Sequence, residues 1–136
     1  MAHTIQVALD CADPRRSAEF WCEVLGYQIQ PPPPGYDDWP AWLADRGIPE
    51  ERWNDAAAAT DPEGKGPRLY FQKVPERKRD KNHVHLDVKV GRDNVDPTVE
   101  RLVGLGATVV RPGEISPLGE YWVVLADPDG NEFCLQ

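Results

Sequence analysis

The stretch Asn82-His83-Val84-His85-Leu86-Asp87-Val88 alternates polar and apolar side chains, as a strand does when only one of its faces is buried. Because successive strand residues point to opposite faces, the pattern predicts that His83, His85 and Asp87 project together from one face. The apolar residues of the stretch are then expected to pack on the other face. This interpretation places two histidines on one polar surface.

A second copy of this opening strand occurs near the N-terminus, at Gln6-Val7-Ala8-Leu9-Asp10-Cys11, with the same spacing of Val, Leu and Asp. The likeness continues along the chain, since Asp13-Pro14 and Asp96-Pro97 each open a segment that ends in Leu-Gly. Near the end of each half stands an Asp-Pro-acid-Gly turn, at residues 61–64 and 127–130. A repeat that persists through several elements indicates duplication. The sequence therefore predicts an α+β fold made of two βαβββ units.

The spacing of apolar residues and of turn residues predicts where each element lies. Asp13 and Asp96 are expected to cap the two main helices, and Gly26 and Gly106 to end them. Ile5 is expected on the apolar face of the first strand. The predicted strands are residues 3–11, 27–30, 56–60, 68–74, 83–90, 107–111, 121–126 and 132–136, with a loop at 112–119 and short helical pieces at 40–46 and 49–54.

The length of 136 residues allows one domain, or two half-domains that share a core. We predict a single domain over residues 1–136, with unit one at 1–75, a linker at 76–81 and unit two at 82–136. Unit one contains an insertion at 31–55, which begins with four prolines and holds three of the five tryptophans. These tryptophans either anchor the insertion on the sheet or form the wall of a ligand cavity. The basic run at 77–81 is interpreted as a solvated linker.

Composition narrows the class of protein. Hydrophobic residues at 40% and charged residues at 28% are typical of a soluble globular chain, and no apolar run is long enough to span a bilayer. A formal net charge of −8 argues against nucleic-acid binding and favours a cationic or neutral small molecule. Three cysteines without paired spacing predict reduced thiols. We therefore expect a cytoplasmic protein.

The repeat and, above all, Ala126-Asp127-Pro128-Asp129-Gly130-Asn131 resemble the vicinal oxygen chelate superfamily, which includes glyoxalase I, bleomycin-resistance proteins, extradiol dioxygenases and fosfomycin-resistance enzymes. Residues 66–76, followed by Lys81-Asn82 and His85-Leu86-Asp87, look like the actinobacterial glyoxalase-like subgroup. The resemblance covers essentially the whole chain. It implies that the two units form a cup-shaped mixed sheet around a small molecule, and that the protein is a homodimer.

The resemblance also implies positions for a divalent metal ion, which the superfamily holds with side chains from the first and last strand of each unit. These positions fall on Gln6, His83 and Cys134, with the fourth at Tyr70 or a neighbour. Zn²⁺ accepts a histidine nitrogen and a thiolate, but a glutamine carbonyl is a weak ligand and no carboxylate stands at the expected places. Mg²⁺, Mn²⁺ or Fe would require acids there. The donors therefore favour a metal-free protein over a site for Zn, Ni, Mn or Fe.

His85 offers a further metal ligand or a general base, because the pKa of histidine lies near neutrality. Alternatively, His83 and His85 are hydrogen-bonded sheet residues that line a polar pocket. Glu132 is a second group that could move a proton, although a carboxylate at the start of a strand is more often solvated. Cys134 has no acid–base partner that the sequence specifies, which favours a structural thiol.

Two functions follow from these residues and from the resemblance. One is a metal-assisted lyase or isomerase, or a dioxygenase-like enzyme, in which a carbonyl is polarised while a proton moves. The other is a metal-free protein of the bleomycin-resistance type that sequesters its ligand between aromatic walls. The candidate substrate-binding residues are Tyr70, Trp122, Val124 and Trp39.

Overall fold

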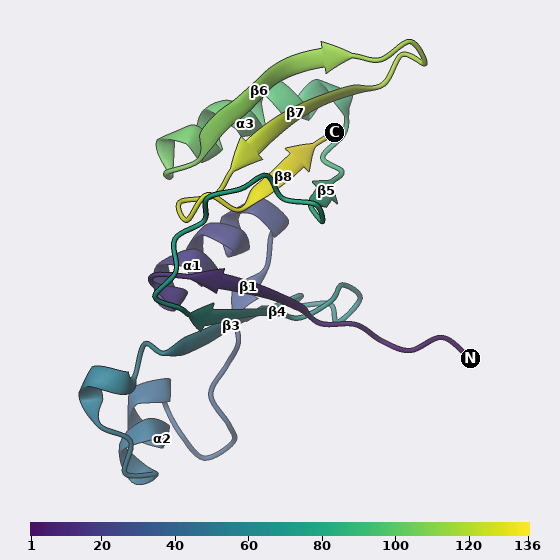
Figure 1. Cartoon of the computed structure of the whole chain (residues 1–136). Helices are drawn as coiled ribbons and strands as arrows, with labels where there is room; N and C mark the ends of the chain where they lie inside the picture. The colour runs from purple at the N-terminus through teal and green to yellow at the C-terminus, as the bar shows by residue number, and fades with distance from the viewer. The chain divides into compact units, whose positions relative to one another are not determined.

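The computed structural model describes all residues, 1–136, and the chain divides into two compact units, Met1–Pro75 and Glu76–Gln136. Each unit contains one four-stranded mixed sheet (Figure 1). No helix in either unit combines the length and the apolar character that crossing a membrane requires.

The first unit has a sheet with the strand order β1-β4-β3-β2. β1 runs parallel to β4, while β4 and β3, and β3 and β2, pair antiparallel. Helix α1 connects β1 to β2 and packs on β3 and β4. The elements are β1 (Val7–Cys11), α1 (Pro14–Leu25), β2 (Gln28–Ile29), α2 (Trp39–Asp45), the 3-10 helix η1 (Glu50–Arg52), β3 (Ala56–Thr60) and β4 (Leu69–Lys73).

The second unit repeats this topology with the order β5-β8-β7-β6, in which β5 runs parallel to β8. Helix α3 connects the first two strands and packs on β7 and β6. The predicted α+β fold of two βαβββ units is therefore confirmed. The elements are β5 (Leu86–Val88), the 3-10 helix η2 (Arg92–Asn94), α3 (Val95–Gly104), β6 (Thr108–Ile115), β7 (Tyr121–Ala126) and β8 (Glu132–Leu135).

Helix α1 has the predicted start and stop. The Asp13 side chain accepts a hydrogen bond from the backbone N–H of Arg16, and Pro14 occupies the first position, where a missing N–H costs nothing. Gly26 ends the helix with a φ of 69°, a conformation that a side chain disfavours. The buried stripe of the helix includes Ala18 and Trp21, which are at most 1% exposed.

In both Asp-Pro turns the aspartate carboxylate accepts hydrogen bonds from backbone N–H groups of the turn. The Asp127 carboxylate accepts the backbone N–H groups of Asp129 and Asn131, each at 2.9 Å. Asp61 accepts those of Glu63, Lys65 and Gly66 in the first unit. These hydrogen bonds hold the pKa of Asp61 below its ordinary value, because they favour the charged form. The duplicated motif in the sequence is thus a duplicated turn that leads into the last strand of each unit.

Two opening strands are shorter than the sequence predicts. β1 begins at Val7, and Ile5 is 73% exposed rather than packed. β5 begins at Leu86, so the prediction of a strand from His83 is wrong, and Val84 is 84% exposed. Pairing with β8 starts only where Leu86 meets Phe133. Before that point the polypeptide bends away.

Two other boundaries also differ from the prediction. Asp96 does not cap α3, because the helix begins at Val95; its carboxylate accepts a hydrogen bond from the Tyr121 hydroxyl at 2.7 Å instead. β6 continues to Ile115 through residues predicted to be a loop. Register shifts on both sides of Arg111 accommodate Pro112 in this edge strand, since a proline cannot donate a ladder hydrogen bond.

Two tryptophans of the insertion, Trp39 and Trp53, donate hydrogen bonds to backbone carbonyl groups. The indole N–H of Trp39 donates to the carbonyl oxygen of Gln30 at 2.7 Å, and that of Trp53 donates to Ile48 at 2.9 Å. Trp39 also packs edge-on against Trp42, with 5.5 Å between ring centroids. These contacts agree with the anchoring interpretation, because they tie α2 to the end of β2.

Replacing Asp13 with alanine is expected to lower the free energy of unfolding by about 1 kcal/mol at neutral pH, the typical value of a helix cap. A side-chain hydrogen bond from Asn54 holds the pKa of Asp13 below its ordinary value. A carboxyl whose pKa is lowered in the folded state stabilises above its unfolded pKa, and the contribution is lost as the pH falls through the folded value. The difference between wild type and Asp13→Ala in urea unfolding should therefore stay constant from pH 7 to about pH 5 and shrink as the pH falls below about 4. Asp37→Ala, at an exposed acid, is the control and should change the unfolding free energy by less than about 0.5 kcal/mol.

Candidate functional site

The two faces of the second sheet differ in what they contact. The hydrogen bond from Tyr121 to Asp96 turns Tyr121 toward α3, and with it every second residue of β7. Trp122 and Val124 therefore point to the opposite side, which we call the α3-distal face. By strand alternation and register this face carries His85, Asp87, Arg111, Glu114, Trp122, Val124, Glu132 and Cys134.

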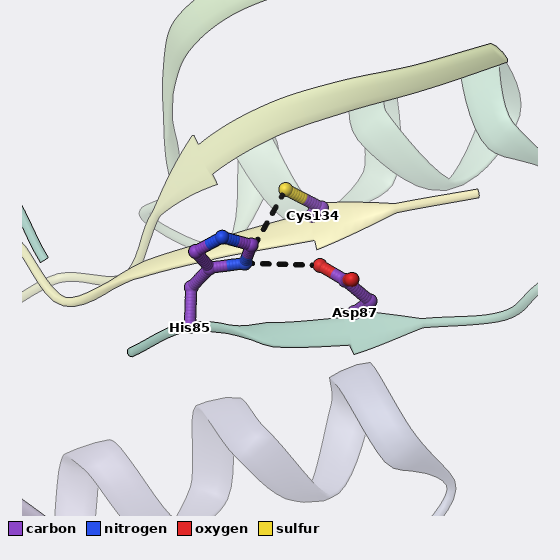
Figure 2. Close-up of side chains that lie close together, drawn as sticks. All are labelled: His85, Asp87 and Cys134. Carbon is purple, nitrogen blue, oxygen red and sulfur yellow. Dashed lines mark hydrogen bonds and ion pairs between the residues drawn. The ribbon is translucent and has the colours of Figure 1, made fainter. Parts of the chain in front are cut away.

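Three of these side chains form one group on the α3-distal face (Figure 2). The parallel register sets Asp87 beside Cys134, and His85 lies two residues earlier on the same side of the chain. The His85 Nδ1 is 3.0 Å from the Asp87 Oδ1 and 3.9 Å from the Cys134 Sγ. The ligating atoms of all three side chains lie within 4.8 Å of one another. We call this set the His85–Asp87–Cys134 group.

The chemistry of the group follows from its contacts. A carboxylate only accepts hydrogen bonds, so the contact with Asp87 assigns the hydrogen of the neutral imidazole to Nδ1 and leaves a lone pair on Nε2 of His85. Burial, and then the charge of Asp87, raises the pKa of the Cys134 thiol to about 11. When no metal ion is bound, the Cys134 thiol is therefore protonated at neutral pH. His85 and Asp87 keep 40% and 48% of their side chains exposed.

Two predicted substrate-binding residues lie next to this group. Val124 is directly opposite Cys134 in the antiparallel pair of β7 and β8, and Trp122 stands two residues away on the same side. Beyond Trp122, the neighbouring strand β6 carries an exposed ion pair between Arg111 and Glu114, at 3.4 Å. The α3-distal face thus combines a polar group, an apolar surface and a charged edge.

Glu132 is not the solvated carboxylate that the sequence suggests. It accepts hydrogen bonds from the Lys81 ammonium at 2.7 Å and from the backbone N–H of Asn82 at 3.0 Å, and only 9% of its side chain is exposed. Lys81 and Asn82 hold the pKa of this carboxyl below its ordinary value. Glu132 therefore fixes the segment before β5, and Lys81 is a bound part of the basic linker.

In the first unit, the candidate residues Gln6 and Tyr70 both contact the side chain of Arg68. The Gln6 Oε1, which a metal would need, accepts a hydrogen bond from the Arg68 Nη1 at 2.6 Å. Tyr70 lies in β4 with the Arg68 guanidinium over its ring. Val7 pairs with Leu69 in the first sheet as Leu86 pairs with Phe133 in the second. Gln6 and Tyr70 hence occupy in unit one the places of His85 and Cys134 in unit two.

His83 stands apart from the group. It is exposed, lies in the bend before β5 and is not among the three clustered donors. Its role as a metal ligand stays a prediction, as does substrate binding by Trp39, which the structure shows anchoring α2.

Neither Asp87 nor Arg68 is among the candidate site residues that the sequence predicts. The alternation of Asp87 with His85 was a usable signal. No local signal marks Arg68, because its partners Gln30 and Gln6 lie 38 and 62 residues away in the chain.

This architecture is shared with known proteins. Residues 6–136 match the family model described as a glyoxalase-like domain. A search of curated proteins finds no match.

Solved structures with the same fold include a mutant of FosX, a genomically encoded fosfomycin resistance protein from Listeria monocytogenes, complexed with Mn(II) and 1S,2S-dihydroxypropylphosphonic acid. It has a TM-score of 0.69 and 14% identity, over 100% of this chain and 90% of that one. A glyoxalase/bleomycin resistance protein/dioxygenase family enzyme from Burkholderia phytofirmans has a TM-score of 0.66 and 18% identity, over 96% and 94%. A glyoxalase-related enzyme from Fulvimarina pelagi has a TM-score of 0.66 and 19% identity, over 99% and 87%.

Proposed function

Because the chain belongs to the glyoxalase-like domain family, we propose that it binds a small molecule on the α3-distal face of its second sheet, with a divalent metal ion at the His85–Asp87–Cys134 group. The observation that carries this proposal is the approach of three different ligating atoms to within 4.8 Å on one face. Such a set of donors is what an open, three-ligand metal site requires, since the remaining position is left for a ligand or water.

The donor chemistry fits the metal. Zn²⁺ accepts an imidazole nitrogen, a carboxylate oxygen and a thiolate, and the group supplies one of each. Asp87 provides the carboxylate that the sequence-based ligand set lacked. Gln6 fits less well, because a guanidinium already binds its oxygen and repels a second cation. A bound divalent ion would polarise an oxygen atom of the ligand.

The other residues of the face have roles that depend on their chemistry alone. Asp87 orients the imidazole of His85, and in the metal-free form the Nε2 lone pair can accept a proton from a carbon acid or a hydroxyl of the ligand. Trp122, which is half-buried, offers an apolar surface beside it, while Val124 is only 7% exposed and packs next to Cys134. These roles suit a lyase or isomerase of the glyoxalase type, in which a proton moves next to a carbonyl.

A second function, metal-free sequestration of the ligand, is favoured by a different observation. His85 and Asp87 satisfy each other at 3.0 Å, and the Cys134 thiol is protonated at neutral pH, so the group is complete without an ion. A protein of the bleomycin-resistance type needs only such a polar group and an aromatic wall. Trp122 supplies the wall on this face.

The assay that separates the two functions is a metal titration. Protein purified without chelator is analysed for bound metal, and the metal-free form is then titrated with Co²⁺, whose thiolate complexes absorb in the near ultraviolet. The metal-dependent proposal expects one ion per chain and a thiolate band. Absence of any binding at micromolar concentrations contradicts it and supports sequestration.

We further propose that the protein is a cytoplasmic homodimer. All three cysteines are free thiols, as a reducing compartment favours. Two-fold pairing is the commonest assembly of soluble proteins. Sedimentation at micromolar concentration tests the dimer, and a single monomeric species would contradict it.

A further inference from the structure

The guanidinium of Arg68 is fixed on the first sheet by two glutamines. Leu69 and Phe71 of β4 are buried, so Arg68 and Tyr70 point to the opposite face by strand alternation. There the Arg68 Nε donates to the Gln30 Oε1 and its Nη1 donates to the Gln6 Oε1, each at 2.6 Å. Gln30 extends from the end of β2 and Gln6 from the start of β1. The two amides therefore hold one planar cation from both sides.

Neither partner neutralises the charge. Both contacts are to neutral amide oxygens, and the guanidinium forms no ion pair with a carboxylate within 4.0 Å. Two other arginines of this unit do form ion pairs, Arg15 with Glu19 and Arg52 with Asp55.

Arg68 also has N–H donors that form no hydrogen bond within the chain. A guanidinium has five N–H donors, and the two glutamines use one on Nε and one on Nη1. The hydrogens that remain include both of Nη2, and the Tyr70 ring lies beneath the guanidinium, 5.4 Å from ring centroid to Cζ. The Tyr70 hydroxyl, on the ring that the guanidinium covers, has no hydrogen-bond partner within the chain and is a further donor.

We propose that Arg68, with Tyr70, binds the oxyanion of a small molecule, a carboxylate or a phosphate-like group, and that Gln6 and Gln30 position the guanidinium for it. A guanidinium binds such groups through two parallel hydrogen bonds, which requires a fixed plane and a free edge. Pre-orientation lowers the entropy cost of binding, because the long side chain is already ordered. The net charge sets only the long-range field, which salt screens within about 10 Å. An anionic group at this site departs from the cationic or neutral ligand that the net charge of −8 favours, because the local guanidinium outweighs the screened long-range field.

Inorganic phosphate is the probe, titrated into isotope-labelled, metal-free protein at constant ionic strength. The arginine Nε–H resonances are followed by NMR. We expect the Arg68 signal to shift in a saturable manner at millimolar phosphate, while Arg52, which is paired with Asp55, serves as internal control. A linear, unsaturated drift shared by all exposed arginines means ionic screening only and overturns the proposal.

Two variants test the geometry. Gln30→Glu keeps the size of the side chain but places a carboxylate against the guanidinium, so phosphate affinity should fall at least tenfold while the fold is retained. Arg68→Gln should lose saturable binding, and Arg52→Gln, the matched control, should not. Unchanged affinity in a folded Gln30→Glu variant overturns the proposal. The site shares no residue with the His85–Asp87–Cys134 group, so Co²⁺ binding and phosphate binding are measured separately and either can fail alone.

Discussion

Substituting Cys134 with serine is expected to weaken Zn²⁺ binding to the metal-free protein by more than about a hundredfold. Loss of an outer-sphere partner of a metal site typically costs ten- to a hundredfold, and loss of the only sulfur ligand should cost more. The change is nearly isosteric, and Cys134 is 8% exposed, so little packing volume is removed. Competition with a chromophoric chelator measures the affinity, and Co²⁺ should lose its thiolate absorption in the same variant.

His83→Ala is the control that distinguishes the two possible histidines. His83 lies outside the group and is exposed, so its removal should leave the affinity within about twofold, whereas His85→Ala should weaken it as Cys134→Ser does. The opposite pattern, with loss in His83→Ala and retention in His85→Ala, would support the ligand set inferred from the sequence and remove the group described above. Circular dichroism of each variant confirms that the sheets are intact.

The fold was predictable because its signals are local and occur twice. Asp13-Pro14 with Gly26 delimits α1, and in the Asp61 and Asp127 turns the aspartate carboxylate accepts hydrogen bonds from backbone N–H groups within five residues. The predicted element boundaries are wrong where a residue distant in the sequence determines the local structure. β5 is shortened because its pairing begins at Phe133, and Asp96 is drawn from its expected capping role by Tyr121. Periodicity reports the preference of a segment but not the position at which its partner strand begins.

The candidate site was only partly predictable for the same reason. Alternation put His85 and Asp87 on one face, but the meeting of Asp87 with Cys134 depends on the register of two strands that lie 47 positions apart in the numbering. A shift of one residue in that register would place Cys134 on the other face. The sequence repeat was aligned on Val, Leu and Asp, which set Gln6 against His83. The sheet registers set Gln6 against His85 instead.

Replacing Phe133 with alanine is expected to lower the free energy of unfolding by about 3–5 kcal/mol. Phe133 is fully buried in β8, where it pairs with Leu86 on one side and Leu125 on the other. The truncation removes a large apolar surface and leaves a cavity that neighbouring strands cannot close. Because domains of this size have a total stability of about 5–15 kcal/mol, the variant should be close to unfolding at 37 °C. Urea denaturation followed by tryptophan fluorescence and by circular dichroism measures the change.

The duplicated topology supplies a matched test and a control. Leu69 holds in β4 the place of Phe133 in β8, and it is 1% exposed, so Leu69→Ala should cost about 2–5 kcal/mol. Leu118→Ala removes the same atoms from a side chain that is 86% exposed, and should change the free energy by less than about 0.5 kcal/mol. A loss below about 1 kcal/mol in Phe133→Ala would mean that the β5–β8–β7 pairing does not form the core of the second unit. If Leu69→Ala and Leu118→Ala lowered the free energy of unfolding equally, β4 and β8 would not be equivalent. The equivalence requires that Leu69 be buried as Phe133 is, and Leu118 is exposed.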